Sequence, residues 1–358
     1  RSYSVTGVQT CALPIWVGPG LLGRVIDGLG NPIDDKGPLH LEAEYPIYAA
    51  PVNPMKRPPI RRPLDLGIRS INGLLTCGQG QRVGIMAGSG VGKSTLLGMI
   101  ARYTEADVNV IALIGERGRE LREFIEKDLQ EQGLHKSVVV VATSDQPPLV
   151  RMRGAYLATT IAEYFKDQGK KVLMMMDSAT RFAMAMREVG LAIGEPPTTK
   201  GYTPSVFAAL PKLLERTGNF PEGSITGLYT VLVEGDDFNE PISDAMRSIL
   251  DGHIVLSRDL AARNIYPPID VMASASRVMA DVTDEQHRKL SGQFKEALAT
   301  YRQSEDLINI GAYKAGSNPG IDHAIRKIDA MTAYQKQAVG DPATLADSIE
   351  GLQQIFEG

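Results

Sequence analysis

The chain has 358 residues, a formal net charge of −4 and a hydrophobic share of 43%. This length excludes a single small module and predicts a large core domain with one or two smaller companions, while the charge balance lacks the positive field typical of a nucleic-acid binder. The only cysteines, Cys11 and Cys77, exclude a disulfide framework and favour a reducing compartment, and no apolar run approaches the ~18 residues of a membrane helix.

The N-terminal part of the chain divides into three segments. Residues 1–17 are expected to be an artefactual or disordered arm, because residues 1–15 lack helical or strand periodicity and resemble a translated sequencing adapter. Residues 18–45 alternate short apolar runs with Gly and Asn-Pro breaks, which predicts strand–turn–strand pieces too short to close a sheet. The proline-rich stretch from Pro46 to Pro63 predicts an extended lead-in to the next domain, residues 46–280.

Within residues 46–280, apolar strand-like runs alternate with helical patterns. The runs are Arg82–Ala87, Val108–Ile114, Val138–Ala142, Lys171–Met176, Leu228–Val233 and Ile269–Ala273. The stretch Glu116–Gln132 has apolar residues at helical spacing, and Gly133 stands where a C-terminal cap is expected. Buried runs separated by helices predict an α/β fold with a mainly parallel sheet covered on both faces.

The last segment, residues 281–358, has only helical patterns and is expected to be a C-terminal helical domain. Thr283 and Gln286 have the spacing of a capping box at the start of a helix that contains Leu290 and Phe294. Asp341-Pro342 is expected to open the last helix.

A glycine-rich loop follows the predicted strand Arg82–Ala87 and precedes a predicted helix from Thr95 to Tyr103. Ala87 stands where the strict phosphate-loop pattern has Gly, and the remainder of the pattern is present. The loop residues expected to bind a nucleotide are Gly88, Ser89, Gly90, Val91, Gly92, Lys93, Ser94 and Thr95. Their backbone N–H groups would surround the β-phosphate, Lys93 would reach the β- and γ-phosphates, and the Ser94 hydroxyl would bind Mg²⁺.

Two acidic residues are expected at the same edge of the sheet. Asp177 ends the apolar run that begins at Lys171, and it is predicted to join Ser94 in the Mg²⁺ shell. Glu116 follows the run Val108–Ile114 and could polarise an attacking water. The alternatives are a strand that ends in Asp by chance and an acidic residue that only begins a helix. The neighbouring phosphate loop favours the catalytic interpretation.

From residue 18 to residue 358 the chain resembles the flagellar and type III secretion export ATPases, which are related to the catalytic subunits of rotary ATP synthases. The stretches that carry the resemblance are Ala87–Thr95, Gly115–Glu120, Gly194–Phe207, Val231–Ile242 and Ser274–Met279. The resemblance implies a RecA-like P-loop core, an N-terminal β-barrel of which residues 18–45 would be the remnant, a C-terminal helical domain and a homohexameric ring.

The resemblance also implies roles for single residues. Glu116 corresponds to the catalytic carboxylate, and Arg181 corresponds to an active-site arginine. Arg277 corresponds to an arginine finger that reaches the γ-phosphate of the neighbouring subunit, and such fingers accelerate hydrolysis by about 10³ to 10⁵. Tyr313 is the candidate for contact with the adenine ring, although an aromatic residue in a helical domain more often belongs to a core.

By this resemblance the protein is expected to hydrolyse ATP with Mg²⁺ and to drive flagellar protein export. The expected partners are further copies of the chain, an export regulator, a stalk protein, export substrates with their chaperones, and a membrane export gate. The expected location is cytoplasmic, peripheral at the inner face of the cytoplasmic membrane, and no nucleic-acid partner is expected. The alternatives are an injectisome ATPase and, on weaker grounds, a rotary ATP synthase subunit or an RNA-translocating hexameric helicase. A non-catalytic ring subunit is disfavoured by the charge of Glu116.

Overall fold

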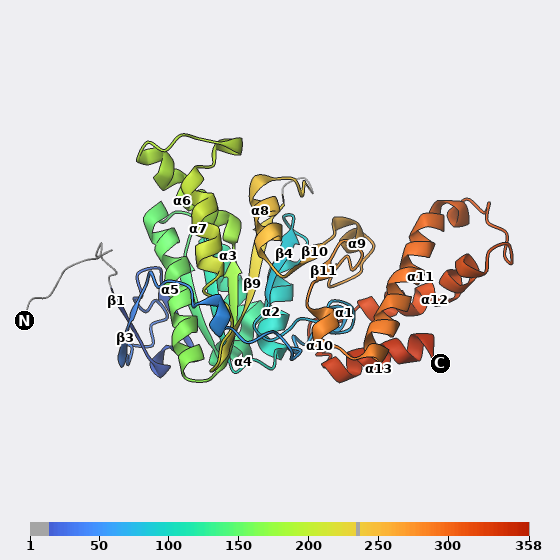
Figure 1. The fold of residues 1–358 in the computed structure, drawn as a ribbon, viewed down its shortest axis with the longest axis horizontal. Helices are drawn as coiled ribbons and strands as arrows, with labels where there is room; N and C mark the ends of the chain where they lie inside the picture. The colour runs from blue at the N-terminus through green and yellow to red at the C-terminus, as the bar shows by residue number, and fades with distance from the viewer. Residues whose placement is uncertain (1–13, 234–236, 358) are drawn as a thin grey trace, which may run out of the picture.

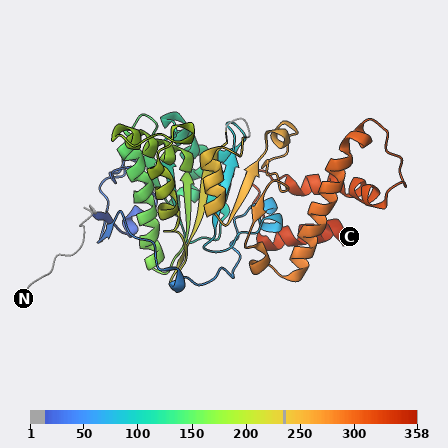
Figure 2. The ribbon, with the colours of Figure 1, turned by 45° about the horizontal axis from the view of Figure 1, so that its top comes forward.

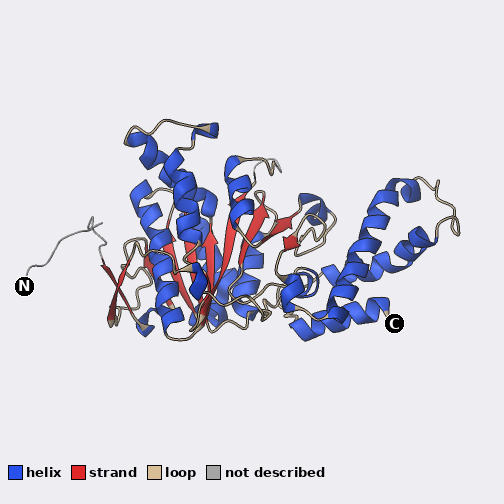
Figure 3. Cartoon of the chain, in the orientation of Figure 1, coloured by secondary structure: helices blue, strands red, loops and turns tan. Residues whose placement is uncertain are grey.

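The computed structural model describes residues 14–233 and 237–357, and its centre is a mainly parallel sheet (Figures 1 and 3). Within the described residues this sheet has nine strands, in the order β11-β10-β4-β9-β7-β5-β6-β2, with β8 paired to β9. The strands are β2 (Arg24–Asp27), β4 (Arg82–Ala87), β5 (Val108–Ile114), β6 (Ser137–Ala142), β7 (Lys171–Asp177), β8 (Gly218–Asn219), β9 (Ser224–Leu232), β10 (Gly252–Leu256) and β11 (Ala275–Ser276). Only β8 and β11 run antiparallel to their neighbours among these strands.

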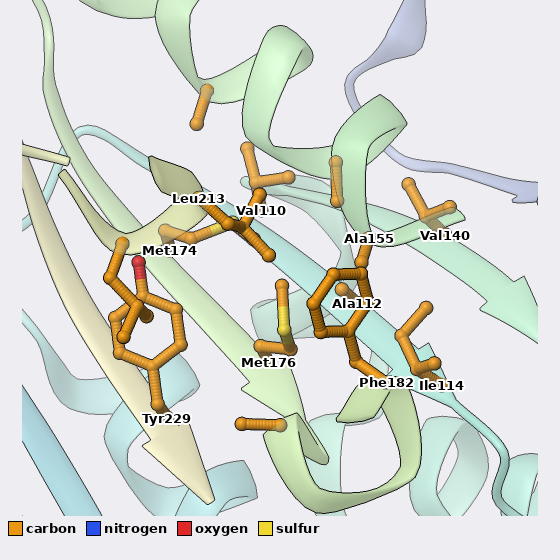
Figure 4. Close-up of a cluster of buried hydrophobic side chains, with 14 of the residues drawn as sticks. Val110, Ala112, Ile114, Val140, Ala155, Met174, Met176, Phe182, Leu213 and Tyr229 are labelled. Atoms are coloured by element: carbon orange, nitrogen blue, oxygen red, sulfur yellow. The ribbon is translucent and has the colours of Figure 1, made fainter. Parts of the chain in front are cut away.

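Helices cover both faces of the sheet, as the sequence pattern predicts. One face packs against α5 (Pro148–Asp167), α6 (Ala179–Ala192), α7 (Pro204–Leu214) and α8 (Pro241–Ile249). The other face packs against α2 (Lys93–Tyr103) and the segment formed by α3 (Gly118–Glu123), the π-helical η3 (Phe124–Leu129) and α4 (Gln130–His135). Figure 4 shows the first interface, where Met174, Met176 and Tyr229 from the strands meet Phe182 of α6. The predicted α/β class is confirmed.

The C-terminal helices form a separate layer beyond the β11 side of the sheet (Figure 2). They are α11 (Glu285–Asn309), α12 (Pro319–Gln335) and α13 (Leu345–Phe356), and they pack on α1 (Arg69–Leu74). At Gly73 of α1, an added Cβ would lie 1.9 Å from the Tyr334 hydroxyl, so only glycine permits this close approach. The remaining short elements are η1 (Pro19–Leu21), η2 (Pro54–Lys56), η4 (Thr199–Gly201), α9 (Arg258–Ala262) and α10 (Met279–Val282). No helix in residues 14–233 or 237–357 is long and apolar enough to cross a bilayer.

The structure corrects one expectation for the N-terminal part of the chain and agrees with another. Residues 14–17 form β1 (Pro14–Val17), which pairs antiparallel with β3 (Ala43–Pro46) on the surface of α5, so the prediction of a disordered arm is wrong for these four residues. The rest of the predicted arm, with Cys11, lies outside the described residues. As predicted, residues 18–45 do not close a sheet of their own. Instead β2 joins the central sheet beside β6, where Val25 and Ile26 are buried.

One predicted strand is wrong, and the strand that lies beside β4 was not predicted. Residues 269–273 form no strand, and Ile269 makes only an isolated bridge to Leu256. The strand beside β4 is β10, whose short run was missed because His253 and the flanking Asp251-Gly252 resemble a turn.

Three predicted helix ends also differ from the structure. Gly133 lies inside α4 rather than at its end, and the absence of a side chain there leaves room for the Leu129 side chain, which would be 2.7 Å from a Cβ. Asp284, rather than the pair Thr283 and Gln286, caps α11 by accepting from the His287 N–H. The last helix begins at Leu345 with a capping box on Thr344, three residues later than Asp341-Pro342 suggested.

Candidate active site

The phosphate loop connects β4 to α2, as predicted. Gly90 and Gly92 have φ values of +77° and +88°, which favour glycine because a side chain would be strained there. Gly92 is the N-cap of α2 and supplies no side-chain hydrogen bond, so the first N–H groups of the helix are free of a side-chain cap. Unpaired amides and the positive end of an 11-residue helix together form a binding place for an anion.

The loop borders a cavity of about 630 Å³ at the carboxyl edge of the sheet. Its walls contain most of the nucleotide-binding residues predicted from the sequence, together with Glu116 and Arg181. The lining residues are Gly88, Ser89, Gly90, Gly92, Lys93, Ser94, Thr95, Gly115, Glu116, Arg117, Glu120, Ser144, Arg181 and Leu232. Val91 does not line the cavity, because its side chain is buried in the core. The size suits a nucleotide phosphate tail with its first water shell.

Lys93 is held at the floor of this cavity by two carboxylates. Its Nζ lies 2.5 Å from Asp177 Oδ1 and 3.7 Å from Glu116 Oε1. Burial disfavours the charged ammonium, but the negative charges of Asp177 and Glu116 outweigh it, and the pKa of Lys93 is raised. Lys93 is therefore a fixed cation at the point where the phosphate loop opens.

Glu116 lines the same cavity as the phosphate loop. It follows Gly115, whose φ of +73° turns the chain at the end of β5. Oε1 of Glu116 is buried and has no hydrogen-bond partner within the described residues. Burial and the charge of Asp177 raise the pKa of Glu116, although Lys93 and Arg181 oppose the shift. A carboxylate with a free oxygen and a raised pKa is suited to orient and polarise a water.

Arg181 lies in the first turn of α6, where Ser178 accepts a hydrogen bond from the Arg181 N–H. Its side chain packs against Gly115, where a Cβ would lie 2.7 Å from Arg181 Cβ. The Nε atom is buried and has no hydrogen-bond partner among residues 14–233 and 237–357. This guanidinium lines the same cavity as Glu116, and its positive charge can stabilise negative charge that develops there.

The structure does not bring the other two predicted site residues to this cavity. Arg277 follows β11 at the far edge of the sheet, where its side chain is exposed and donates to the Arg247 carbonyl. Tyr313 lies between α11 and α12, and its hydroxyl bonds to Asp322 Oδ1 and the Asn318 carbonyl, each at 3.0 Å. Neither side chain can touch a nucleotide held by the phosphate loop of its own chain.

The sequence interpretation missed residues that the fold places next to this site. The ring of Tyr266 is 46% exposed and lies 3.8 Å from the Cβ position of Gly92, so it offers a face on which a base could stack. Thr230 of β9 donates from Oγ1 to Asp177 Oδ1 at 2.6 Å. Neither residue stands in a local motif, so only the three-dimensional arrangement identifies them.

The oxygen groups near Lys93 fit Mg²⁺. Ser94 is exposed and lines the cavity, and the Asp177 carboxylate bonds to the neighbouring Lys93. The described part of the chain contains no group of three or more His, Cys, Asp or Glu side chains that could hold a metal by themselves. A site with only one or two protein oxygen ligands beside bound phosphates is typical of Mg²⁺, because this ion takes its other ligands from water and the substrate phosphates.

A larger open cavity, about 840 Å³, lies at the opposite end of the strands. Its walls include Arg82 and Asp251, and Arg82 is bonded to both Asp251 and Glu215. Arg82 is therefore already paired, and the described residues that line this cavity include no glycine-rich loop at a helix N-terminus to bind phosphates.

Family models match two parts of the chain. Residues 67–276 match the nucleotide-binding domain of the ATP synthase alpha/beta family, and residues 283–354 match the C-terminal domain of the T3SS EscN ATPase. Together the two models cover the observed sheet from β4 to β11 and the three C-terminal helices.

Among curated relatives, the flagellum-specific ATP synthase of Bacillus subtilis is 59% identical over 346 residues, covering 96% of this chain and 78% of that protein. The type 3 secretion system ATPase of Xanthomonas euvesicatoria is 52% identical, with the same coverage of 96% and 78%. Among solved structures, the assembled ATPase EscN of enteropathogenic E. coli matches with a TM-score of 0.90 and 52% identity, covering 96% of this chain and 83% of that one. A structure of EscN in complex with its central stalk EscO matches equally well.

Proposed function

The chain belongs to the ATP synthase alpha/beta family, within its flagellum-specific and type III secretion ATPases, and we propose that it hydrolyses ATP to drive flagellar protein export. The observation that carries the proposal is a single cavity that joins a phosphate loop to the carboxylate of Glu116, whose buried Oε1 accepts no hydrogen bond from the described residues. The loop supplies the binding site for phosphates, and the carboxylate supplies the acceptor that activates water.

In the proposed reaction, the loop amides and the α2 N-terminus bind the β- and γ-phosphates of ATP. Lys93 leaves Asp177 and donates to phosphate oxygens, because Lys93 lines the cavity that the loop borders. Glu116 accepts a hydrogen bond from the attacking water through its free oxygen, and Arg181 offsets negative charge near the γ-phosphate. Ser94 and Asp177 would hold Mg²⁺, which supplies positive charge to the phosphate oxygens when bound.

The proposed working form is a homohexamer. Arg277 is exposed at the β11 edge and far from the phosphate loop of its own chain, so it can reach a nucleotide only on a neighbouring copy. The relative EscN was solved as an assembled ATPase and in complex with its central stalk EscO. By analogy the chain would bind a stalk protein, and also an export regulator, substrate–chaperone complexes and a membrane export gate. Its proposed location is the cytoplasmic face of the membrane that carries this gate.

The ATPase proposal is tested by phosphate release from Mg²⁺-ATP, with the Lys93→Ala variant as the control for the loop. The wild type is expected to hydrolyse ATP, and Lys93→Ala is expected to lose binding of a fluorescent ATP analogue in direct titration. Equal affinity of the two proteins for the analogue would remove the phosphate loop from the proposed function.

An injectisome ATPase is the second candidate, because the C-terminal helices match the T3SS EscN model and EscN itself is a close structural relative. A chimera separates the two candidates: the matched region of the Bacillus subtilis flagellum-specific ATP synthase is replaced by the corresponding residues of this chain. Swimming motility of the host would support the flagellar assignment. Full ATPase activity without motility would contradict it.

A further inference from the structure

Thr230 occupies the strand that separates the phosphate loop from Asp177. It lies on β9, between β4, which leads into the loop, and β7, which ends in Asp177. Tyr229 faces Met176 in the register of β9 and β7, so Thr230 is placed directly beside Asp177. Alternate residues of a strand face opposite sides, and Figure 4 shows Met176 and Tyr229 in the core on the α5 and α6 side. Thr230 and Asp177 therefore face the α2 side, where Lys93 lies.

The Thr230 hydroxyl donates to Asp177 Oδ1 at 2.6 Å, and the Met176 carbonyl lies farther from it, at 3.3 Å. Thr230 is fully buried, and Asp177 is 4% exposed, so water does not replace this donor. Lys93 Nζ bonds to the same Oδ1. Among the described residues, Oδ2 of Asp177 has no hydrogen-bond donor, so both donors fix one oxygen and leave the other available.

In the proposed mechanism, nucleotide binding changes which donors bond to Asp177 Oδ1. Lys93 is the cation that must turn to the phosphates, and its departure removes one of the two donors on Oδ1. The Thr230 hydroxyl then remains as the donor that holds the carboxylate in place. A valine would fill the same volume in a buried strand and has a high strand propensity, so packing alone does not require a hydroxyl at this position.

We propose that Thr230 is a positioning residue that fixes Asp177 through Oδ1, so that Oδ2 is presented to the Mg²⁺ that accompanies ATP. The proposal rests on the proposed function, because it assigns Asp177 to the Mg²⁺ shell. Partners that orient a metal ligand typically change metal affinity or activity by about 10- to 100-fold when they are removed.

The test compares Thr230→Val, which removes the hydroxyl at constant shape, with Thr230→Ser, which keeps it. The readout is the Mg²⁺ concentration that gives half-maximal tight binding of a fluorescent, non-hydrolysable ATP analogue, together with the affinity for that analogue in EDTA. Thr230→Val is expected to need about 10-fold more Mg²⁺, with an affinity in EDTA within about 2-fold of the wild type. Thr230→Ser is expected to stay within about 2-fold of the wild type in both measurements.

A Thr230→Val variant with the Mg²⁺ requirement of the wild type would overturn the proposal, as would equal weakening with and without Mg²⁺, which is the sign of a general structural role. Thr230→Ala removes the same hydroxyl and replaces Thr230→Val if that variant does not fold. The Asp177→Asn variant distinguishes a failure of the Thr230 proposal from a failure of the proposed function. A shifted Mg²⁺ requirement in Asp177→Asn but not in Thr230→Val rejects Thr230 alone, whereas a wild-type protein that does not bind the analogue rejects the proposed function.

Discussion

Replacing Glu116 by Gln should make the protein more stable and nearly inactive. Glu116 Oε1 is buried without a donor, and its nearest cation, Lys93, is 3.7 Å away and already bonded to Asp177. A neutral amide removes the cost of this buried charge and its repulsion by Asp177. Relieving one poorly solvated polar group is worth about 1 kcal/mol, which for a chain of this size raises the melting temperature by about 1–3 °C. Loss of the group that activates water is expected to lower turnover by about 10²- to 10⁴-fold.

The stability gain of Glu116→Gln should depend on pH. Burial and the charge of Asp177 raise the pKa of Glu116, so its ionised form destabilises the folded protein at pH values above that raised pKa. The stability gain of Glu116→Gln should therefore be full near pH 8 and should shrink as the pH falls toward the ordinary carboxyl value, where the wild-type group is also neutral. Hydrolysis by the wild type should fall over the same acidic range, because the protonated carboxyl cannot accept a proton from water.

The assays are thermal unfolding between pH 4 and pH 8, phosphate release, and titration with a fluorescent ATP analogue. Glu120→Gln is the matched control, since Glu120 lines the same cavity with a side chain that is 50% exposed, and neither stability nor turnover should change. Wild-type turnover in Glu116→Gln would refute the catalytic assignment. A lower melting temperature at pH 8 would refute the stability reasoning.

Three further predictions concern other parts of the molecule. The specific ATPase activity of the wild type should rise with protein concentration, and Arg277→Ala should hydrolyse ATP about 10³-fold more slowly, or slower still. A wild-type specific activity that does not change from dilute to concentrated protein would contradict a role for Arg277 on a neighbouring copy. Tyr266→Ala should weaken binding of an ATP analogue by about 10-fold in fluorescence titration, whereas Tyr313→Ala should not, and unchanged binding by Tyr266→Ala would exclude base stacking there. Arg216→Met should lower the free energy of unfolding in urea by about 3–5 kcal/mol, because it leaves the partly buried Glu163 carboxylate without its partner, and a loss below about 1 kcal/mol would show that solvent reaches that carboxylate.

The fold class and the family resemblance were predictable because they rest on local patterns. The phosphate loop, the apolar run before Asp177 and the run before Gly115 are each contiguous in sequence, and each has the expected place at the carboxyl edge of the sheet. Parallel strands bring their ends to one edge, so these motifs predict a common site. The roles assigned to the individual site residues remain predictions.

The features that the sequence did not predict depend on contacts between distant segments. Thr230 lies 53 residues from Asp177, and nothing in its own strand distinguishes it from any other β-branched core residue. Tyr266 reaches the phosphate loop only because the chain after α9 turns back toward Gly92. The short strand β2 lacks any local sign of its partner, since its apolar residues become buried only when it lies beside β6.

The most direct measurement is a structure of the protein with Mg²⁺ and a non-hydrolysable ATP analogue. The phosphate tail should lie in the loop between Gly88 and Ser94, with Lys93 Nζ bonded to phosphate oxygens instead of Asp177, and Glu116 should face the γ-phosphorus across one water. An analogue bound elsewhere, or a Lys93 still paired with Asp177 while Glu116 points away from the γ-phosphate, would contradict the proposed mechanism.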